Sequence, residues 1–363
     1  MRNYIGVDIG STKCAVSLGR EDQEGMRILG KAQFPTKGAP DEVLAGCAQR
    51  LDDLLAEQKL RYADIAAIGI SCGGPLDSRK GLILSPPNLP GWDRVEIVRF
   101  FRERTGIPTA LQNDANACAV AEWRFGAGRG TENMIFLTFG TGLGAGLILD
   151  GCLYSGTNDM AGEVGHVRLE PDGPVGYGKA GSAEGFCSGG GIGRLAQTAV
   201  EAARDRGETP LLWERAGGTE GITAKLTAEL AFAGDAFSRG VYETCGTELG
   251  KLLSALIDVL NPQRIILGGV FMRSAALIRP AMEAVIRRES LALSASVCDI
   301  VPAGLGESIG DYAALGVASL HASAAAKPAS RAVDEFLARH PELEDCRAEL
   351  ETLAGRATAE GRF

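Results

Sequence analysis

The sequence predicts an α/β protein of two domains, and three observations lead to this prediction. Short apolar segments rich in β-branched residues alternate with amphipathic segments, as expected where strands and helices alternate. A length of 363 residues exceeds the usual size of one domain, and 45% apolar residues suffice for two packed cores. A glycine-rich turn between two strands occurs once in each half of the chain, at residues 8–13 and 139–146.

The first domain is expected to cover residues 1–115, with residues 303–320 returning to it. Its expected elements are a strand, turn and strand at 4–18, a strand at 28–34, an amphipathic helix at 40–58, a buried strand at 65–70, a helix at 95–105, a strand at 109–111 and a helix after 116. The returning segment predicts a helix over 309–320, which would hold the two domains together.

The second domain is expected to cover residues 116–302, and residues 321–363 are expected to form an extension. The expected elements of the second domain are strands at 134–139 and 147–149, a helical region at 223–260 and a strand at 265–269. In the extension, the Ala/Ser-rich segment 322–330 predicts a linker. Pro341, an acidic first turn and apolar residues up to Leu353 predict one helix after it.

Composition and charge disfavour several classes of protein. A net charge of −9 and a pI near 5.1, without clustered Lys and Arg, argue against nucleic-acid binding. No stretch has the apolar length of a membrane span, and the N-terminus does not resemble a signal peptide, so a cytoplasmic protein is expected. Nine cysteines without a Cys-x-x-Cys pair are expected to be reduced and mostly buried.

The two glycine-rich turns are candidates for binding phosphate. Glycine and small hydroxyl residues allow backbone N–H groups to approach phosphate oxygens closely. Neither turn has the Walker A pattern, and each returns to a strand instead of starting a helix. A single such turn is more often a bulge or tight bend, but the pair favours a nucleotide clamp. The candidates for ATP and phosphate binding are Asp8, Gly10, Ser11, Thr12, Lys13, Gly140, Thr141, Gly142, Gly144, Gly268 and Gly269.

Three further segments are candidates for ligand contacts, and two of them leave a simpler alternative open. Gly268 and Gly269 end a predicted strand, where bare backbone suits a ring or ribose, yet the same pair would make an ordinary strand-to-helix turn. Asn113 and Asp114 lie between a strand and a helix, where they would also serve as an N-cap. The loop at residues 71–77 follows a buried strand, where open α/β sheets place ligands.

Taken together, these motifs resemble the ROK family of sugar kinases and sugar-responsive repressors. The resemblance covers about residues 4–320, and it is carried by residues 8–13 (DIGSTK), 113–114 (ND), 140–146 (GTGLGAG), 161–166 (AGEVGH) and 261–269 (NPQRIILGG). It implies an actin/hexokinase-like fold with a mixed sheet in each of two domains and a central cleft. The repressor branch carries an N-terminal DNA-binding domain, for which a first motif at residue 8 leaves no room, so the kinase branch is favoured.

The resemblance also implies roles for individual residues. Phosphoryl transfer to an alcohol needs a carboxylate that orients the hydroxyl and takes its proton, and the family places this role on Asp114. ATP and Mg²⁺ are the implied cofactors, and Asp8 is a candidate for an indirect contact to Mg²⁺. The implied substrate-binding residues are Gly74, Asn88, Asn113, Asp114, Glu163, His166 and Glu184. A small-molecule sugar is the implied partner, with no nucleic acid or membrane, and a homodimer is expected.

One segment departs from the family pattern. Many relatives hold a structural zinc ion with the histidine that corresponds to His166 and with three cysteines in a Cys-x-Cys-Gly-x-x-Gly-Cys segment. Residues 175–182 (VGYGKAGS) have the glycines of this segment and none of its cysteines. His166 and the nearby Cys187 cannot supply the four ligands of a structural zinc site, so no zinc is predicted.

The expected function is an ATP-dependent sugar kinase acting on a hexose or N-acylhexosamine, with transfer to the 6-hydroxyl. A non-catalytic sugar sensor of the same family is the alternative, and the presence of both glycine turns and of Asp114 favours the enzyme. An actin-like filament protein would share the turns, but Glu163 and His166 argue against it. The spacing of the motifs does not identify the sugar.

Overall fold

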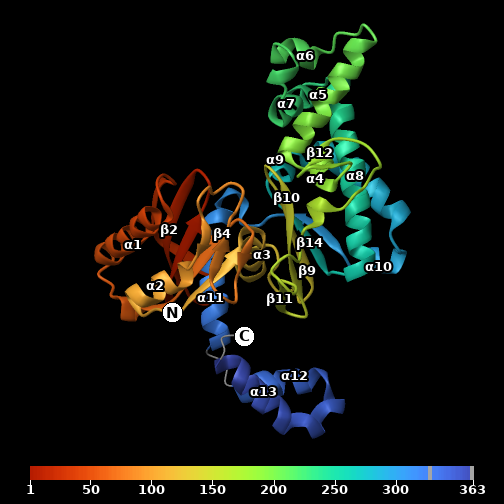
Figure 1. Ribbon diagram of the computed structural model, residues 1–363. Helices are drawn as coiled ribbons and strands as arrows, with labels where there is room; N and C mark the ends of the chain where they lie inside the picture. Colours follow the sequence, from red (N-terminus) through yellow and green to blue (C-terminus); the bar gives the residue numbers. More distant parts are fainter. Residues whose placement is uncertain (326–328, 360–363) are drawn as a thin grey trace. The chain divides into compact units, whose positions relative to one another are not determined.

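The computed structural model describes residues 1–325 and 329–359, and the chain forms two compact units (Figure 1). One unit comprises residues 1–121 and the chain from Ile309 onward, and the other comprises residues 122–308. The first unit therefore ends within helix α3 (Asp114–Phe125), and the chain re-enters it at the start of helix α11 (Ile309–Ala325). The boundaries predicted from the sequence lie at 115 and 303.

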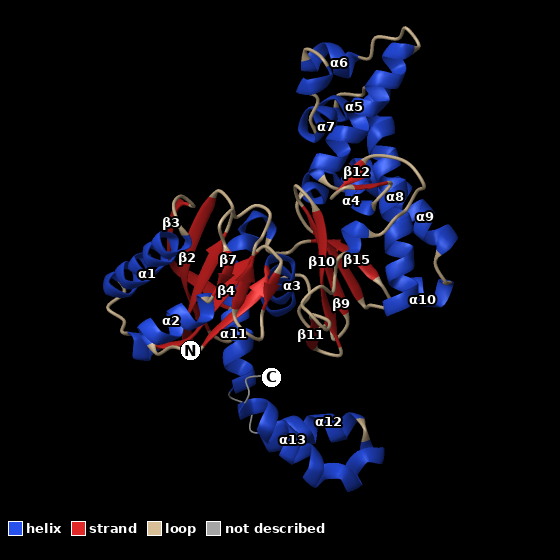
Figure 2. Cartoon of the chain, viewed as in Figure 1, coloured by secondary structure: helices blue, strands red, loops and turns tan. Residues whose placement is uncertain are grey.

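The first unit is built on a five-stranded mixed sheet in the order β3-β2-β1-β4-β8. Figure 2 shows strands of this sheet, with β2, β3 and β4 labelled. Strand β1 is antiparallel to β2 and parallel to β4, and β4 is parallel to β8. The strands are β1 (Arg2–Ile9), β2 (Lys13–Glu21), β3 (Met26–Pro35), β4 (Ile65–Cys72) and β8 (Thr109–Asn113). A small antiparallel sheet contains β5 (Leu76–Asp77), β6 (Leu82–Leu84) and β7 (Asp93–Val95).

Helices cover both faces of the large sheet, and the strand period of two decides what each face presents. The face with Ile5 and Val7 packs against α1 (Pro40–Glu57) and α2 (Ile97–Thr105) in one apolar core. The opposite face carries glycine, which lets α11 lie directly on the strands. A Cβ atom on Gly69 would lie 2.1 Å from the carbonyl oxygen of Ala314. Glycine at this position thus sets the distance between sheet and helix.

The second unit has a five-stranded mixed sheet in the order β11-β10-β9-β14-β15. Its central strand β9 is antiparallel to β10 and parallel to β14, as β1 is to β2 and β4 in the first unit. The strands are β9 (Met134–Phe139), β10 (Leu143–Leu149), β11 (Cys152–Tyr154), β14 (Arg264–Leu267) and β15 (Asp299–Pro302). The two glycine-rich turns therefore join equivalent strands, β1 to β2 and β9 to β10.

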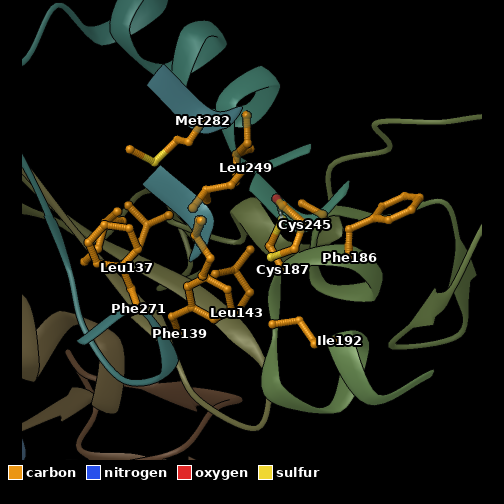
Figure 3. Packing of buried hydrophobic residues seen from close by; sticks show 14 of the residues in the cluster. Leu137, Phe139, Leu143, Phe186, Cys187, Ile192, Cys245, Leu249, Phe271 and Met282 are labelled. Atoms are coloured by element: carbon orange, nitrogen blue, oxygen red, sulfur yellow. Dashed lines mark hydrogen bonds between the residues drawn. The ribbon is translucent and has the colours of Figure 1, made fainter. Parts of the chain in front are cut away.

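Helices pack on one face of this sheet around a continuous apolar core. Figure 3 shows Leu137 and Phe139 of β9 among side chains from several helices. The helices of the unit are α4 (Ala183–Cys187), α5 (Gly189–Asp205), α6 (Leu211–Ala216), α7 (Ala224–Phe232), α8 (Ala236–Leu260), α9 (Val270–Glu289) and α10 (Ala292–Ser296). Helices α8 and α9 approach closely, because a Cβ atom on Gly246 would lie 2.4 Å from the carbonyl oxygen of Ile278.

The prediction of an α/β protein with a mixed sheet in each half is confirmed, and several element boundaries differ. The helix predicted over 95–105 begins at Ile97, since residues 93–95 form β7. The helical region predicted over 223–260 is two helices, because Gly234 has a φ of 102° and Asp235 caps the N-terminus of α8. Helices α4, α5 and α6 precede this region and were not predicted.

The C-terminal segment also differs from the prediction. Helix α11 continues to Ala325 and α12 (Ala329–Arg339) follows, so the predicted linker at 322–330 is helical except for 326–328, which lie outside the described residues. The predicted helix from Pro341 is a 3-10 turn, η5 (Pro341–Cys346), followed by α13 (Arg347–Ala359). Val333, Leu337 and Ala354 form a small apolar cluster between α12 and α13, whereas Leu353 is 59% exposed.

No helix in residues 1–325 and 329–359 is long and apolar enough to cross a membrane.

Candidate active site

The first glycine-rich turn joins β1 to β2 and carries Asp8 at its start. Ser11, Thr12 and Lys13 are exposed at the turn. The N–H of Gly10 donates a hydrogen bond to the carbonyl oxygen of Lys13 at 3.2 Å. The turn requires glycine at this position, because a Cβ atom there would lie 2.7 Å from the same oxygen. The hydroxyl of Thr36 in the neighbouring segment donates to the carbonyl oxygen of Gly10 at 2.7 Å. The turn is thus fixed while its hydroxyl and ammonium groups face solvent.

Asn113 and Asp114 lie where β8 ends and α3 begins. Because β8 runs parallel to β4 and β4 parallel to β1, the C-terminal ends of these strands place Asp114 near Asp8. The backbone N–H of Ala115 lies 2.9 Å from Asn113 Oδ1 and 2.8 Å from Asp114 Oδ1. Both side chains therefore take part in capping α3, the simpler role considered for them. Each keeps further polar atoms for a ligand, because the cap uses one oxygen of each group.

The electrostatic environment of Asp8 and Asp114 differs from that of a surface carboxylate. Burial is the largest of the causes that raise the pKa of Asp8 to about 6, and repulsion from Asp114 and then from Asp311 adds to it. A hydrogen bond from Ser71 and attraction to Lys13 act in the opposite direction and lower the pKa. Desolvation also raises the pKa of Asp114, against the hydrogen bond from the N–H of Ala115, although this side chain stays accessible to solvent. A carboxylate with a raised pKa is a better proton acceptor at neutral pH than an ordinary aspartate.

Gly74 and Asn88 are the two loop residues of this unit that were predicted to contact a ligand, and Gly74 lies beside Asn113. A Cβ atom on Gly74 would lie 3.2 Å from Asn113 Nδ2, so glycine keeps this amide uncrowded. Asn88 lies exposed between β6 and β7. Within the described residues, no hydrogen bond joins Asn88 to the other predicted site residues.

The second glycine-rich turn joins β9 to β10 and packs against two other glycine-rich segments. Gly269 follows β14 with a φ of 56°, and a Cβ atom there would lie 1.9 Å from the carbonyl oxygen of Phe139. The N–H of Gly189, the first residue of α5, donates to the carbonyl oxygen of Gly140 at 2.8 Å. Gly140 and Thr141 are exposed at the turn. The structure therefore brings the predicted phosphate turn and the Gly268–Gly269 pair together.

Glu184 connects this turn to the candidate sugar-binding residues of the second unit. Its Oε2 atom accepts a hydrogen bond from the N–H of Leu143 at 3.1 Å, and a Cβ atom on Gly142 would lie 2.6 Å from the same oxygen. A Cβ atom on Gly165, between Glu163 and His166, would lie 3.3 Å from the Cβ atom of Glu184. These contacts place Glu184 at the glycine turn and the segment 163–166 next to it.

Glu163 and His166 lie in the short turn that the sequence analysis considered for them. A 3-10 helix, η2, covers Val164–His166, and the N–H of His166 donates to the carbonyl oxygen of Glu163 at 3.1 Å. Residues three apart in such a turn lie one above the other. Both residues are exposed, as a ligand contact requires.

Several neighbours of these residues were not predicted from the sequence. Ser71 and Asp311 belong to the surroundings of Asp8, and only the parallel strand pairing and the position of α11 bring them there. The start of α5 could have been predicted from the sequence, because Ser188, which three glycines follow, is a residue type that commonly caps the N-terminus of a helix. Ser188 Oγ accepts from the N–H of Gly191 at 2.9 Å and donates to the carbonyl oxygen of Glu184 at 2.7 Å.

The residues at the metal positions of the family do not fit a structural zinc ion. Val175 is 47% exposed and offers no ligand atom, Ser182 is fully buried, and Cys187 is buried with its thiol 3.6 Å from the carbonyl oxygen of Cys245. In the part of the chain that the structure describes, no group of three or more His, Cys, Asp or Glu side chains is arranged to hold a metal ion. The donor set lacks the thiolates and the ligand count of a structural zinc site.

The fold and the two glycine turns define the class of protein. Two units on mixed five-stranded sheets, each with a glycine turn between its central strand and the next, have the architecture of the actin-like ATPase fold. The chain belongs to the ROK family, whose family model matches residues 4–323.

Similar proteins include enzymes and a regulator. A glucokinase of Halalkalibacterium halodurans is 32% identical over 284 residues, which cover 77% of this chain and 84% of that one. The crystal structure of a ROK family glucokinase from Streptomyces griseus in complex with glucose and AMPPNP is 30% identical, with a TM-score of 0.66 and coverage of 88% and 98%. The DNA-binding transcriptional dual regulator NagC of Escherichia coli is 28% identical, with coverage of 80% and 69%. These similarities support a sugar kinase.

Proposed function

We propose that this protein transfers the γ-phosphoryl group of ATP to a hexose or N-acylhexosamine, at its 6-hydroxyl. The observation that carries the proposal is Asp114, an accessible carboxylate of raised pKa at the C-terminal end of β8. A group of this kind can accept the proton of a sugar hydroxyl as the oxygen attacks phosphorus. The similarity to a glucokinase structure that holds glucose and AMPPNP supports the choice of sugar and nucleotide.

The remaining residues divide into those for the sugar and those for the phosphates. Asn113, Glu163, His166 and Glu184 offer amide, carboxylate and imidazole groups that suit vicinal hydroxyls. The turns at residues 10–13 and 140–142, exposed at 11–13 and 140–141, suit the phosphate oxygens, and the Gly268–Gly269 pair suits the nucleoside. Binding by several such groups holds the acceptor hydroxyl in line with the γ-phosphorus, which lowers the entropy cost of the reaction.

Asp8 fits an indirect contact to magnesium. Burial, and after it repulsion from Asp114 and Asp311, raises the pKa of Asp8, so a cation bound nearby would favour its charged form. Mg²⁺ binds few protein carboxylates and keeps several of its waters, and when bound it neutralises charge on the transferring phosphoryl group. Asp8 would hold such a water.

The test is ADP release with Mg-ATP against a panel of free hexoses and amino-hexoses, with Asp114→Asn as the comparison. Loss of the base is expected to reduce kcat by about 10²–10⁴-fold, with sugar binding retained. Asp53→Asn, at an exposed carboxylate on α1, is the matched control and is expected to keep full turnover. Near-full activity of Asp114→Asn would show that this residue is not the base.

A sugar sensor is the second candidate, because the relatives include the regulator NagC. A sensor would bind a sugar without turnover. If no sugar supports ADP release above the Asp114→Asn rate while one sugar raises the melting temperature, the sensor replaces the kinase as the better explanation.

A further inference from the structure

The segment between His166 and Glu184 keeps a defined path although it lacks the metal-binding residues of related proteins. Three positions that hold cysteine in zinc-binding relatives hold Val175, Tyr177 and Ser182 here. Tyr177 is 77% exposed, and its ring centroid lies 6.4 Å from that of His166. None of these groups is a thiolate. The order of the segment must therefore come from other contacts.

The first of these contacts joins the β12–β13 hairpin to the turn that carries His166. Strands β12 (Val175–Gly176) and β13 (Lys179–Ala180) are antiparallel, and Tyr177 and Gly178 form the turn with φ values of 43° and 76°. Lys179 Nζ donates to the carbonyl oxygen of His166 at 2.7 Å. An ammonium group thus bridges the hairpin and η2, the two parts that a zinc ion would join.

The second contact joins the hairpin to the chain just after η2. Arg168 Nη1 donates to the carbonyl oxygen of Ala180 at 2.8 Å and to that of Pro171 at 3.2 Å. A backbone hydrogen bond joins the same two segments, since the N–H of Ala183 donates to the carbonyl oxygen of Val167 at 2.8 Å. These bonds hold residues 167–171 against 180–183.

The third contact fixes the start of α4, which carries Glu184. Ser182 is fully buried and is the N-cap of α4, where its Oγ atom accepts from the N–H of Gly185 at 3.3 Å. The same oxygen donates to the carbonyl oxygen of Gly176 in β12 at 3.4 Å. The residue at the last cysteine position therefore links the hairpin to the helix by hydrogen bonds.

We infer that Lys179 and Arg168 are positioning residues, which together with Ser182 hold His166 and Glu184 in place without a metal ion. Lys179 donates one hydrogen bond to a carbonyl oxygen of η2, and Arg168 donates two, so each cation links two segments of backbone. The inference rests on the proposed function only in assigning His166 and Glu184 to the sugar. The order of the segment itself is independent of that assignment.

The first experiment measures the segment without sugar or turnover. Hydrogen–deuterium exchange of peptides covering residues 164–185 is compared between the wild type, Lys179→Met and Lys225→Met. Lys225 is the matched control, because its side chain is 87% exposed on α7. Lys179→Met is expected to exchange about three- to tenfold faster in this segment, the effect of one solvent-exposed hydrogen bond, and Lys225→Met is expected to match the wild type.

The same experiment tests the role of metal. A zinc chelator is expected to leave exchange in the wild type unchanged, and elemental analysis is expected to find far less than one zinc ion per chain. Unchanged exchange in Lys179→Met would overturn the inference. So would one zinc ion per chain together with faster exchange after chelation.

The second experiment separates positioning from general stability. Lys179→Met is expected to raise KM about tenfold for the sugar that the panel identifies, with kcat at saturating sugar within about twofold, and Lys179→Arg is expected to restore KM. An unchanged KM with faster exchange would show that Lys179 orders the segment without positioning a sugar contact. If no sugar is turned over at all, the proposed function fails, while the exchange measurement still decides whether Lys179 holds the segment.

Discussion

Replacing Asp8 with asparagine is expected to stabilise the first unit while it removes activity. Asp8 is held among neighbours that disfavour its charge, with burial as the largest cause and Asp114 and Asp311 as further ones. Asparagine has nearly the same shape and can still accept the hydrogen bond from Ser71. The substitution therefore removes the unfavourable charge and leaves the packing of β1 almost unchanged.

The size and sign of the effect follow from the pKa of Asp8. A rise from 3.8 to about 6 corresponds to about 3 kcal/mol between the two protonation states. Solvent screens part of this energy because Asp8 is only partly buried, so about 1–2 kcal/mol is expected. The folded state binds the proton more tightly than the unfolded state, so stability of the wild type falls as pH rises from 4 to 6. The advantage of Asp8→Asn is therefore full above pH 6 and absent below about pH 4.

The assay is thermal unfolding of the first unit, followed by fluorescence of Trp92, which is 2% exposed in that unit. Trp123 and Trp213 are replaced by phenylalanine in the background. Asp8→Asn is expected to raise Tm by about 3–6 °C at pH 7.5, with Asp53→Asn unchanged as the control for an exposed carboxylate. A Tm at pH 7.5 equal to or below that of the wild type would refute the electrostatic reasoning. A rise of equal size at pH 4 would show that packing, and not charge, causes it.

Two further predictions concern glycine contacts, and both are measured by urea unfolding. Gly246→Ala in α8 is expected to destabilise the second unit by about 1–3 kcal/mol, since the new Cβ atom would meet the carbonyl oxygen of Ile278 at 2.4 Å. Gly240→Ala in the same helix has no atom within 4 Å of its Cβ and is expected to gain about 0.5–1 kcal/mol; equal effects of the two changes would contradict the contact. Gly69→Ala is expected to cost the first unit about 3 kcal/mol, because the carbonyl oxygen of Ala314 belongs to the helix backbone and cannot move away alone; a loss below about 1 kcal/mol would show that α11 adapts.

The alternation of strands and helices could be read from the sequence because each strand has a short apolar run. The run at 65–70 and the run at 134–139 both became central or neighbouring strands of mixed sheets. The end of the chain was read less well. Val333, Leu337 and Ala354 pack between two short helices, a contact that periodicity within a single helix does not show.

The individual site candidates could be read from motifs, but their surroundings could not. Asp8 and Asp114 are recognisable as carboxylates at the ends of strands, whereas Asp311, which raises the pKa of Asp8, lies far from both in the chain. Only the packing of α11 on β1 and β4 brings Asp311 near Asp8. Charges contributed by distant segments decide the pKa of a buried carboxylate, so its value requires the fold.

The two short turns, neither of them diagnostic alone, occupy the same place in the topology of their units. In each unit the turn leaves the central strand of the sheet and returns in the adjacent antiparallel strand. In the first unit the turn begins with a carboxylate, Asp8, and in the second a carboxylate from a different segment, Glu184, binds the turn at Leu143. In the second unit, Glu184 is therefore both a candidate sugar contact and a hydrogen-bond partner of the candidate phosphate turn. A sugar that forms hydrogen bonds with Glu184 would therefore act, through this one carboxylate, on the backbone that we propose binds the nucleotide.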